Sequence, residues 1–483
     1  MKTVFRNRYA GPPKPGNRME VSRTVWMQSI RRNAGESWQK PIADWLLKQR
    51  WFLEKQESPG LQLVSLDEFE IQRKPVWWLL LTLQAAPGKV YYQLPLTVQT
   101  HTQIKKPYSV VKLQDKDGSK SQPVWLMDAW HEPAFVAWFA SFWHKSRWPK
   151  PFMGDWLGKP LQKEFTNKCI KPVDEGQTNQ AYLLGTKYFL KVQRRTIPGI
   201  SLDEEVSREL TRRHSPCTVP LMGTIHWQTE PYSSPLATIS SSLNPAINGW
   251  NFFMQHTNQS VISQAARKLG RITAQFHSIL AEPSGVRTFQ PQKVQAKKII
   301  QRWKERLIKT IHLVSSRSDV RSKKFVELAS QWSCAEKYSN VPKSVTVQRI
   351  HGDFHLAQVL LHREKWFITD FEGEPLRPLA ERRARDLPCR DVAGMLRSFG
   401  YLDAVCKRKK LAFPLKIAQE SFLKGYSEKL SPHQAEELGR LLPYYLLEKA
   451  LYEIEYEIRS RPAWVNIPLR AASELLEQFK SNH

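Results

Sequence analysis

Residues 350–374, which read IHGDFHLAQVLLHREKWFITDFEGE, decide the fold. Asp353 and Gln358 stand five residues apart in this stretch, and Asp370 follows twelve residues after Gln358. The apolar run WFI at 366–368 predicts a short buried strand that leads directly to Asp370. Two carboxylates and an amide oxygen are therefore expected on tight loops beside buried strands. This arrangement indicates a catalytic or metal-binding site.

Phosphoryl transfer needs these groups. The reaction spreads charge over the γ-phosphate oxygens and requires an aligned hydroxyl, and protein kinases use an Asp and an Asn at this same separation. We expect Asp353 to be the catalytic base that accepts the hydroxyl proton. Gln358, Asp370 and Glu372 are the expected ligands of Mg²⁺, which prefers hard oxygen atoms. His355 either supports the loop or contacts the substrate.

A cation for the nucleotide phosphates is expected before the catalytic loop. Lys191 stands in the apolar run FLKV on a predicted strand, and Glu205 follows fourteen residues later on the predicted helix SLDEEVSREL. A strand Lys paired with a helix Glu is the kinase arrangement. In the preceding loop GQTNQ, backbone N–H groups of Gln177, Thr178 and Asn179 are expected to contact phosphate. The pattern GxxxxGK[ST] is absent, which argues against a P-loop enzyme.

Composition and charge limit the classes of function. The chain has 483 residues, of which 41% are hydrophobic, and a formal charge of +28. This apolar content excludes a mostly disordered chain. A positive field attracts polyanions, but the basic residues are spread along the whole chain, and nucleic acid is not expected as a partner. The five cysteines form no CxxC pattern, which fits a reducing cytoplasm. No apolar run reaches the ~20 residues of a membrane span.

The chain divides into four expected parts. Residues 1–36 are basic and nearly free of acidic side chains, and we expect a disordered extension there. Residues 37–164 indicate a cap and intermediate α+β domain, in which PIADWLLKQRWF at 41–52 has the spacing of one helix face. Residues 165–245 are the expected nucleotide-binding N-lobe of a kinase. Residues 246–483 are the expected, mainly helical C-lobe with the catalytic loop and the acceptor site.

Several runs resemble the maltokinases. The resemblance is carried by HGDFHLAQVLL, by WFITDFEGEPLRPLAERRARDLPCRDVAGMLRSFGY at 366–401, and by the cap-domain runs WLLKQRWF, QLPL and DAWHEPAF. Two more matching runs are LKVQRRTIPGISLDEEV at 190–206 and LEKALYEIEYEIRSRPAWVNIPL at 447–469. The family implies an α+β, bilobal, protein-kinase-like fold similar to the aminoglycoside phosphotransferases, with an N-terminal α+β cap domain.

The resemblance also implies a reaction and further site residues. Maltokinases convert maltose and ATP into maltose 1-phosphate and ADP, so ATP and Mg²⁺ are the implied cofactors. The product feeds glycogen and other α-glucan synthesis, which implies trehalose synthase and a maltosyltransferase as pathway partners. By position, the backbone near Ser240 and Ser242 is implied at the adenine hinge. Sugar binding needs polar groups and an aromatic platform, for which the candidates are Arg390, Lys449, Tyr452, Tyr456 and Trp464, with His355 beside the base.

Alternatives stay open on the sequence alone. A related sugar or aminoglycoside-type kinase with a different acceptor would have the same catalytic loop. A pseudokinase-like binding protein that uses its basic surface is a second alternative, against which the intact Asp353 and Asp370 argue. A structural ion pair is the alternative role of Arg390, and ordinary helix packing is that of Tyr452 and Tyr456.

Overall fold

The computed structural model of the protein divides the chain into two compact units. Unit 1 comprises Met1–Ser201 and Leu221–Ser242, and unit 2 comprises Leu202–Pro220 and Leu243–His483. The structure describes residues 28, 30, 36–49, 51–52, 60–84, 90–99, 109–113, 124–145, 148–157, 165–173, 179–229, 232–333 and 341–481. The expected extension at 1–36 thus lies almost wholly outside the described residues, as do Gln177 and Thr178.

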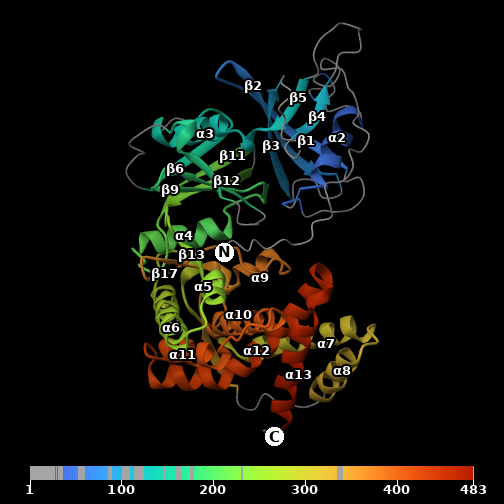
Figure 1. The fold of residues 1–483 in the computed structure, drawn as a ribbon, viewed down its shortest axis with the longest axis vertical. Coiled ribbons are helices and arrows are strands. Elements are labelled where there is room, and N and C mark those ends of the chain that lie inside the picture. The colour runs from blue at the N-terminus through green and yellow to red at the C-terminus, as the bar shows by residue number, and fades with distance from the viewer. Residues whose placement is uncertain are drawn as a thin grey trace. The chain divides into compact units, whose positions relative to one another are not determined.

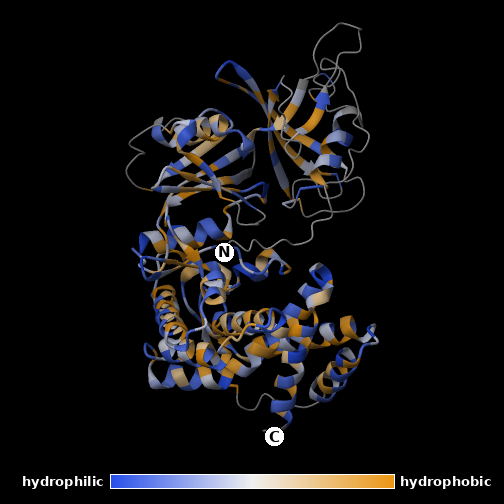
Figure 2. Cartoon of the chain, viewed as in Figure 1, coloured by the Kyte–Doolittle hydropathy of each residue, from blue (hydrophilic) through white to orange (hydrophobic). Residues whose placement is uncertain are grey.

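The first sheet of unit 1 is antiparallel and follows the order β1-β2-β3-β5-β4, with β10 paired to the start of β3. The runs LQLVSLDEFEIQ, VWWLLLTL and VYYQLPLTV, which read as strands in the sequence, form most of its first three strands. Its strands are β1 (Leu61–Ile71), β2 (Lys74–Leu83), β3 (Tyr91–Gln99), β4 (Ser109–Leu113), β5 (Val124–Asp128) and β10 (Arg195–Thr196). Figure 2 shows hydrophobic residues concentrated along these strands, as expected for a sheet that is covered by other elements.

Helix α2 (Glu36–Leu46) covers one face of this sheet with its apolar residues. The helix ends at Leu46, so Trp51 lies beyond it, although the sequence spacing placed Trp51 on the same helix face. The ring of Trp51 instead lies 4.4 Å from the guanidinium of Arg194. This cation–π contact joins residues that are far apart in the sequence. The local spacing of apolar residues therefore could not predict it.

The second sheet of unit 1 is also antiparallel and has the order β6-β11-β12-β9-β8-β7. It contains the strands expected for the nucleotide-binding lobe, and it also contains β6, from the region expected to belong to the cap and intermediate domain. The four-part division stays a prediction. Its strands are β6 (Phe152–Trp156), β7 (Ile170–Val173), β8 (Gln180–Leu184), β9 (Tyr188–Val192), β11 (Leu221–Thr229) and β12 (Tyr232–Ser241).

The two sheets of unit 1 share one hydrophobic core, into which helix α3 (Pro133–Lys145) also packs (Figure 1). The ring of Trp78 on β2 lies 5.7 Å from those of both Trp130 and Trp227, the latter on β11. Buried aromatic rings contribute large apolar areas and favour such edge-to-face contacts. The first and second sheets of unit 1 therefore belong to one folded body.

Unit 2 is mainly helical, as expected, and packs around two hydrophobic clusters. Helices α6 and α11 cross closely because both carry glycine at the contact: a Cβ on Gly270 would lie 2.0 Å from the carbonyl oxygen of Phe422. Its helices are α4 (Leu202–Arg212), α5 (Gly249–Gln255), α6 (Gln259–Ala281), α7 (Lys297–Ser315), α8 (Val320–Ser333), α9 (Leu379–Arg383), α10 (Cys389–Arg408), α11 (Leu415–Ser427), α12 (Pro432–Ser460) and α13 (Asn466–Ser481).

Unit 2 also contains two small antiparallel sheets, and the one formed by β13, β16 and β17 carries the stretch of sequence at 350–374. Strand β14 (Gln292–Gln295) pairs with β15 (Ser344–Val347), and β16 (Val359–His362) pairs with β13 (Ile247–Asn248) and β17 (Lys365–Ile368). In the β16–β17 hairpin, Val359 lies opposite Ile368. The residues on either side of this pair, Gln358 and Thr369, are therefore neighbours, and the N–H of Thr369 donates to the carbonyl of Gln358 at 3.0 Å.

A sheet-rich unit 1 and a helical unit 2 confirm the α+β class expected from the sequence. Across the part of the chain that the structure describes, no helix has both the length and the apolar character that a bilayer crossing requires.

Candidate active site

Asp391, in the first turn of α10, fixes the start of the catalytic loop. Its two carboxylate oxygens accept the backbone N–H groups of His351 at 2.8 Å and of Gly352 at 2.9 Å. The Nε2 of His277 lies 3.0 Å from the same carboxylate. Burial raises the pKa of Asp391, but the hydrogen bonds and charges around it outweigh burial, so its pKa lies below the ordinary value. Asp391 is thus an ionised anchor for the loop.

The imidazole of His351 joins the loop to the segment before Asp370. Its Nδ1 accepts the N–H of Asp353 at 3.3 Å, and its Nε2 donates to the carbonyl of Thr369 at 3.0 Å. Gly394 of α10 allows the loop to lie close to the helix, because a Cβ there would be 2.5 Å from the carbonyl oxygen of Phe354. The loop that carries Asp353 is therefore braced from two sides.

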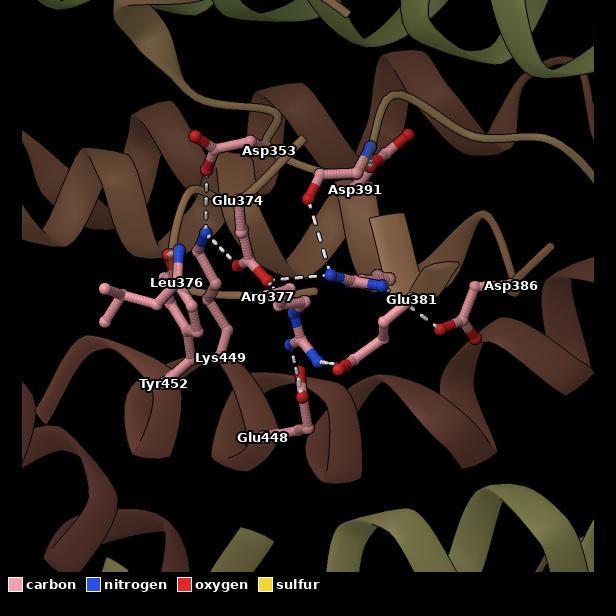
Figure 3. A network of polar contacts seen from close by, with 12 residues as sticks. Asp353, Glu374, Leu376, Arg377, Glu381, Asp386, Asp391, Glu448, Lys449 and Tyr452 are labelled. Carbon is pink, nitrogen blue, oxygen red and sulfur yellow. Dashed lines mark hydrogen bonds and ion pairs between the residues drawn. The ribbon is translucent and has the colours of Figure 1, made fainter. Parts of the chain in front are cut away.

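Lys449 of α12 lies between two carboxylates, as Figure 3 shows. Its Nζ is 3.2 Å from Oδ1 of Asp353 and 2.6 Å from Oε1 of Glu374. Burial lowers the pKa of Lys449, but the neighbouring carboxylates outweigh burial and raise it above the ordinary value. The Nε2 of His355 lies 3.8 Å from the other oxygen of Asp353. The Asp353 side chain is therefore held by a permanent cation.

Glu374 connects Lys449 to a buried network of ion pairs (Figure 3). Its Oε2 lies 2.7 Å from Nη2 of Arg390 and also pairs with Arg377, which contacts Glu448 at 2.5 Å. Burial raises the pKa of Glu374, but the three surrounding cations lower it well below the ordinary value. Arg390 thus takes part in a buried ion pair, the alternative that the sequence left open, and its contact with a sugar stays a prediction.

Asp203, Asp370 and Glu372 bring three carboxylates together, with one oxygen of each within 4.8 Å of the others. Asp203 enters from α4, and its Oδ1 accepts the N–H of Phe371 at 3.0 Å. Asp370 has a φ of +69°, a left-handed conformation that Asp tolerates better than most residues. The side-chain amide of Gln358 donates to Oδ2 of Asp370 at 3.0 Å. Three hard oxygen donors and a neighbouring amide fit a divalent cation such as Mg²⁺.

The aromatic residues expected at the sugar lie on α12 and after its end. The rings of Tyr452 and Tyr456 stack at 6.4 Å with an angle of 22°. Tyr452 is buried, its hydroxyl accepts the N–H of Leu376 at 3.3 Å, and the guanidinium of Arg377 lies 5.3 Å from its ring. Two arginine guanidiniums lie 5.2 and 4.9 Å from the half-buried ring of Trp464. Tyr452 therefore packs in the core, and sugar contact by these rings stays a prediction.

The residues expected at the nucleotide belong mostly to unit 1. Lys191 lies on β9, between β8 and β12, as expected for a strand lysine. Ser240 lies on β12, and the N–H of Ser242 donates to a backbone carbonyl at 2.7 Å. Asn179 is half-buried directly before β8. Their contacts with a nucleotide stay predictions.

Glu205 belongs to unit 2, on α4. Its carboxylate lies 3.4 Å from a guanidinium nitrogen of Arg349 and 3.3 Å from one of Arg383. The predicted pairing of Glu205 with Lys191 joins residues of different units and stays a prediction. On the same helix, Asp203 is the carboxylate that contacts the segment after Asp370.

Sequence reasoning missed Asp203, Glu374 and Asp391. One signal was available for Asp391, because backbone N–H groups in a tight loop need an acceptor. Nothing local indicates that Asp391 supplies it, since the two segments are about 40 residues apart in the chain. Asp203 stands beside two other acidic residues in LDEEV, so the sequence alone does not separate them.

Two family models match the chain. Residues 170–400 match the phosphotransferase enzyme family APH, and residues 45–132 match the maltokinase N-terminal cap domain. The first match contains the catalytic loop and the carboxylate cluster, and the second covers strands of the first sheet of unit 1.

Two curated relatives are both named glucosamine kinase. That of Mycolicibacterium smegmatis (strain ATCC 700084 / mc(2)155) is 24% identical over 340 residues, which are 65% of this chain and 82% of the relative. That of Streptacidiphilus jiangxiensis is 27% identical over 261 residues, which are 50% of this chain and 58% of the relative.

Solved structures share the fold. A glucosamine kinase in complex with glucosamine, ADP and inorganic phosphate matches with a TM-score of 0.59 at 18% identity, over 92% of this chain and 100% of that chain. Another crystal form of glucosamine kinase matches with a TM-score of 0.62 at 18% identity, over 91% and 99%. These matches confirm the bilobal, kinase-like fold with an added N-terminal domain. The chain thus combines a segment that matches the maltokinase N-terminal cap domain with a following segment that matches the APH phosphotransferases.

Proposed function

We propose that this protein is a sugar kinase that transfers the γ-phosphoryl group of ATP to a hydroxyl of maltose, giving maltose 1-phosphate and ADP. One observation carries the proposal. The imidazole of His351 contacts both the backbone of Asp353 and the residue before Asp370, so a base and a metal-ligand carboxylate share one rigid support. A phosphotransferase needs these two groups on either side of the transferred phosphate.

Asp353 is the proposed base. It accepts the proton of the sugar hydroxyl while the hydroxyl oxygen bonds to the γ-phosphorus and the bond from phosphorus to the β–γ bridging oxygen breaks. Lys449 keeps the Asp353 carboxylate oriented through its 3.2 Å contact. Glu374 holds Lys449 in turn. Correct placement of the hydroxyl is a large part of catalysis in such a reaction.

Asp203, Asp370, Glu372 and the amide oxygen of Gln358 are the proposed holders of Mg²⁺. When bound, Mg²⁺ neutralises the charge that develops on the phosphate oxygens. Gln358 restrains Asp370 through its hydrogen bond, and Asp203 restrains the following residue through the N–H of Phe371. Lys191 in unit 1 is the proposed partner of the nucleotide phosphates, with ATP as the donor.

Maltose is the proposed acceptor for two reasons. The N-terminal segment matches the maltokinase cap domain, and the buried ammonium of Lys449 lies beside Asp353. A cationic amino sugar placed close to this ammonium would experience like-charge repulsion, which a neutral sugar avoids. The product, a sugar ester activated at its anomeric carbon, would suit a glycosyl-transferring enzyme that builds α-glucans.

Glucosamine is the second candidate acceptor, because the two curated relatives described above carry the name glucosamine kinase. A panel of maltose, glucosamine, glucose, trehalose and an aminoglycoside separates the candidates when ADP release is followed with each. Maltose should give a kcat/KM at least tenfold above that of the other sugars. Faster turnover of glucosamine than of maltose would identify glucosamine as the acceptor. If no sugar in the panel stimulated ADP release, the proposal of a sugar kinase would be wrong.

A further inference from the structure

Helix α9 presents two consecutive arginines to two different segments of unit 2. Arg382 donates from Nη1 to the backbone carbonyl of Glu372 at 3.0 Å. Arg383 places its Nε 3.3 Å from the carboxylate of Glu205 on α4. Both of these segments carry carboxylates of the proposed metal site, so α9 contacts the site from two sides.

Arg382 also covers the residue that follows Glu372. Gly373 has a φ of +72°, and a Cβ built there would lie 3.3 Å from the Cβ of Arg382. The left-handed conformation and the close approach of the arginine stem both favour glycine at this position. Because a guanidinium is always charged, its hydrogen bond to the Glu372 carbonyl is stronger than one between neutral groups. Arg382 therefore fixes the backbone from which the Glu372 carboxylate extends.

Arg383 reaches the third carboxylate of the cluster, Asp203, through Glu205. Both acidic residues lie on α4, two positions apart. The buried Arg349 contacts the same Glu205 carboxylate at 3.4 Å and donates to the backbone carbonyl of Arg383. The contacts among Glu205, Arg349 and Arg383 form a closed ring, which fixes α4 against α9. The position of Asp203 relative to Glu372 therefore depends on both arginines of α9.

The spacing of the three carboxylates decides whether they can share one ion. One oxygen each of Asp203, Asp370 and Glu372 lies within 4.8 Å of the others. Mg²⁺ requires oxygen ligands at about 2.0–2.1 Å in octahedral geometry, so a small displacement of one carboxylate removes it from the ion. Like charges at this spacing also repel one another. Fixed contacts that hold the two segments in place are therefore needed before the ion binds.

We propose that Arg382 and Arg383 are positioning residues of the metal site. Arg382 sets the position of Glu372, and Arg383 sets that of Asp203 through Glu205. The inference rests on the proposed function, because it assumes that these carboxylates hold the divalent ion.

The test is titration of the full chain with Mn²⁺ in the absence of nucleotide, with free Mn²⁺ followed by electron paramagnetic resonance. Mn²⁺ prefers the same oxygen ligands as Mg²⁺. Arg382→Met and Arg383→Met keep an apolar stem and remove the hydrogen-bond donors. Arg385→Met is the matched control, because Arg385 belongs to the same run of arginines and donates to the carbonyl of Arg287, which lies in neither carboxylate-bearing segment.

Mn²⁺ affinity should fall about tenfold in Arg382→Met and in Arg383→Met, and it should keep the wild-type value in Arg385→Met. Neither arginine should have a further effect once the carboxylate that it positions is gone. Arg383→Met added to Asp203→Asn should bind Mn²⁺ as Asp203→Asn does alone, and Arg382→Met added to Glu372→Gln should bind as Glu372→Gln does alone. An arginine that only stabilised the fold would lower the affinity equally in both backgrounds.

Thermal unfolding separates positioning from folding. The side chain of Arg383 is 38% exposed, and an ion pair at such a position contributes little to stability. The melting temperature of Arg383→Met should therefore stay close to that of the wild type while the Mn²⁺ affinity falls.

Wild-type Mn²⁺ affinity in Arg382→Met and Arg383→Met would overturn the inference and leave the metal site itself in place. Equal losses of affinity with and without the carboxylates of Asp203 and Glu372 would also overturn it. If the wild type bound no Mn²⁺, the inference and the metal site of the proposed function would both be wrong.

Discussion

The ammonium of Lys449 lies 3.2 Å from the Oδ1 of Asp353, and both groups belong to a network that reaches through Glu374 into the interior of unit 2. A base that is fixed in this way needs little reorganisation when it receives a proton. The residues around Asp353 therefore predict distinct effects for changes at the base, at its supports and at the metal ligands.

Asp353→Asn should fold normally and lose catalysis. The amide keeps the size of the side chain but cannot accept the hydroxyl proton, so turnover should fall by roughly 10² or more. Nucleotide affinity, measured by titration, should change little, since the ATP-binding groups are elsewhere. Unchanged turnover in Asp353→Asn would show that another group is the base.

Asp203→Asn and Asp370→Asn should each weaken Mg²⁺-dependent nucleotide binding by about 10-fold or more, because each removes a carboxylate from the proposed metal site. Calorimetric titration with ATP in the presence and absence of Mg²⁺ measures the difference directly. Glu364→Gln is the control, because its side chain is 90% exposed in the β16–β17 turn. Equal Mg²⁺ dependence in Asp203→Asn and Glu364→Gln would exclude Asp203 from the metal site.

Lys449→Met should destabilise unit 2 by about 3–5 kcal/mol, because it leaves the buried carboxylate of Glu374 short of one cation. Chemical denaturation followed by tryptophan fluorescence measures this change. Lys416→Met, at a side chain 88% exposed in a surface ion pair, should change stability by less than about 1 kcal/mol. If the two substitutions lowered the free energy of unfolding by similar amounts, the ion pairs of Lys449 would contribute no more to stability than a surface ion pair.

Gly394→Ala should displace the catalytic loop, because its Cβ would meet the carbonyl oxygen of Phe354 at 2.5 Å. A shift of about 1 Å in the reacting groups lowers turnover by about 10²-fold. Gly439→Ala is a matched control on an exposed face of α12, where a Cβ meets nothing within 4 Å. Its helix should become more stable by about 1 kcal/mol with no loss of turnover. Full activity in Gly394→Ala would show that the loop tolerates the displacement.

Glu209 should make the free energy of unfolding of the protein depend on pH under acidic conditions. Hydrogen bonds from Arg212, Ser284 and Arg213 outweigh the opposing effect of burial and lower the pKa of Glu209 from 4.5 to about 2. Its contribution is fully present above about pH 4.5 and is lost as the pH falls toward 2. The free energy of unfolding of Glu209→Gln should therefore fall less steeply between pH 4.5 and 2 than that of the wild type. Parallel pH profiles would contradict this assignment.

The sequence predicted elements whose signal is local. The apolar runs at 366–368 and around Lys191 indicated the strands β17 and β9. The pairing of β17 with β16, which brings Gln358 beside Asp370, was not predicted.

Contacts between distant segments were not predictable in the same way. Trp51 covers Arg194 and leaves the helix face on which its spacing placed it. Asp391 anchors a loop 40 residues earlier in the chain, and Asp203 reaches a segment 168 residues later. Tertiary packing decides such contacts, and propensity and periodicity carry no information about it.

The most direct test of the central claim is proton-coupled ³¹P NMR of the products formed from maltose and ATP. The account predicts a new phosphate resonance coupled to the anomeric proton of maltose, formed by the wild type and at most about one hundredth as fast by Asp353→Asn. A phosphate ester at any other sugar position, or no sugar phosphate at all, would contradict it.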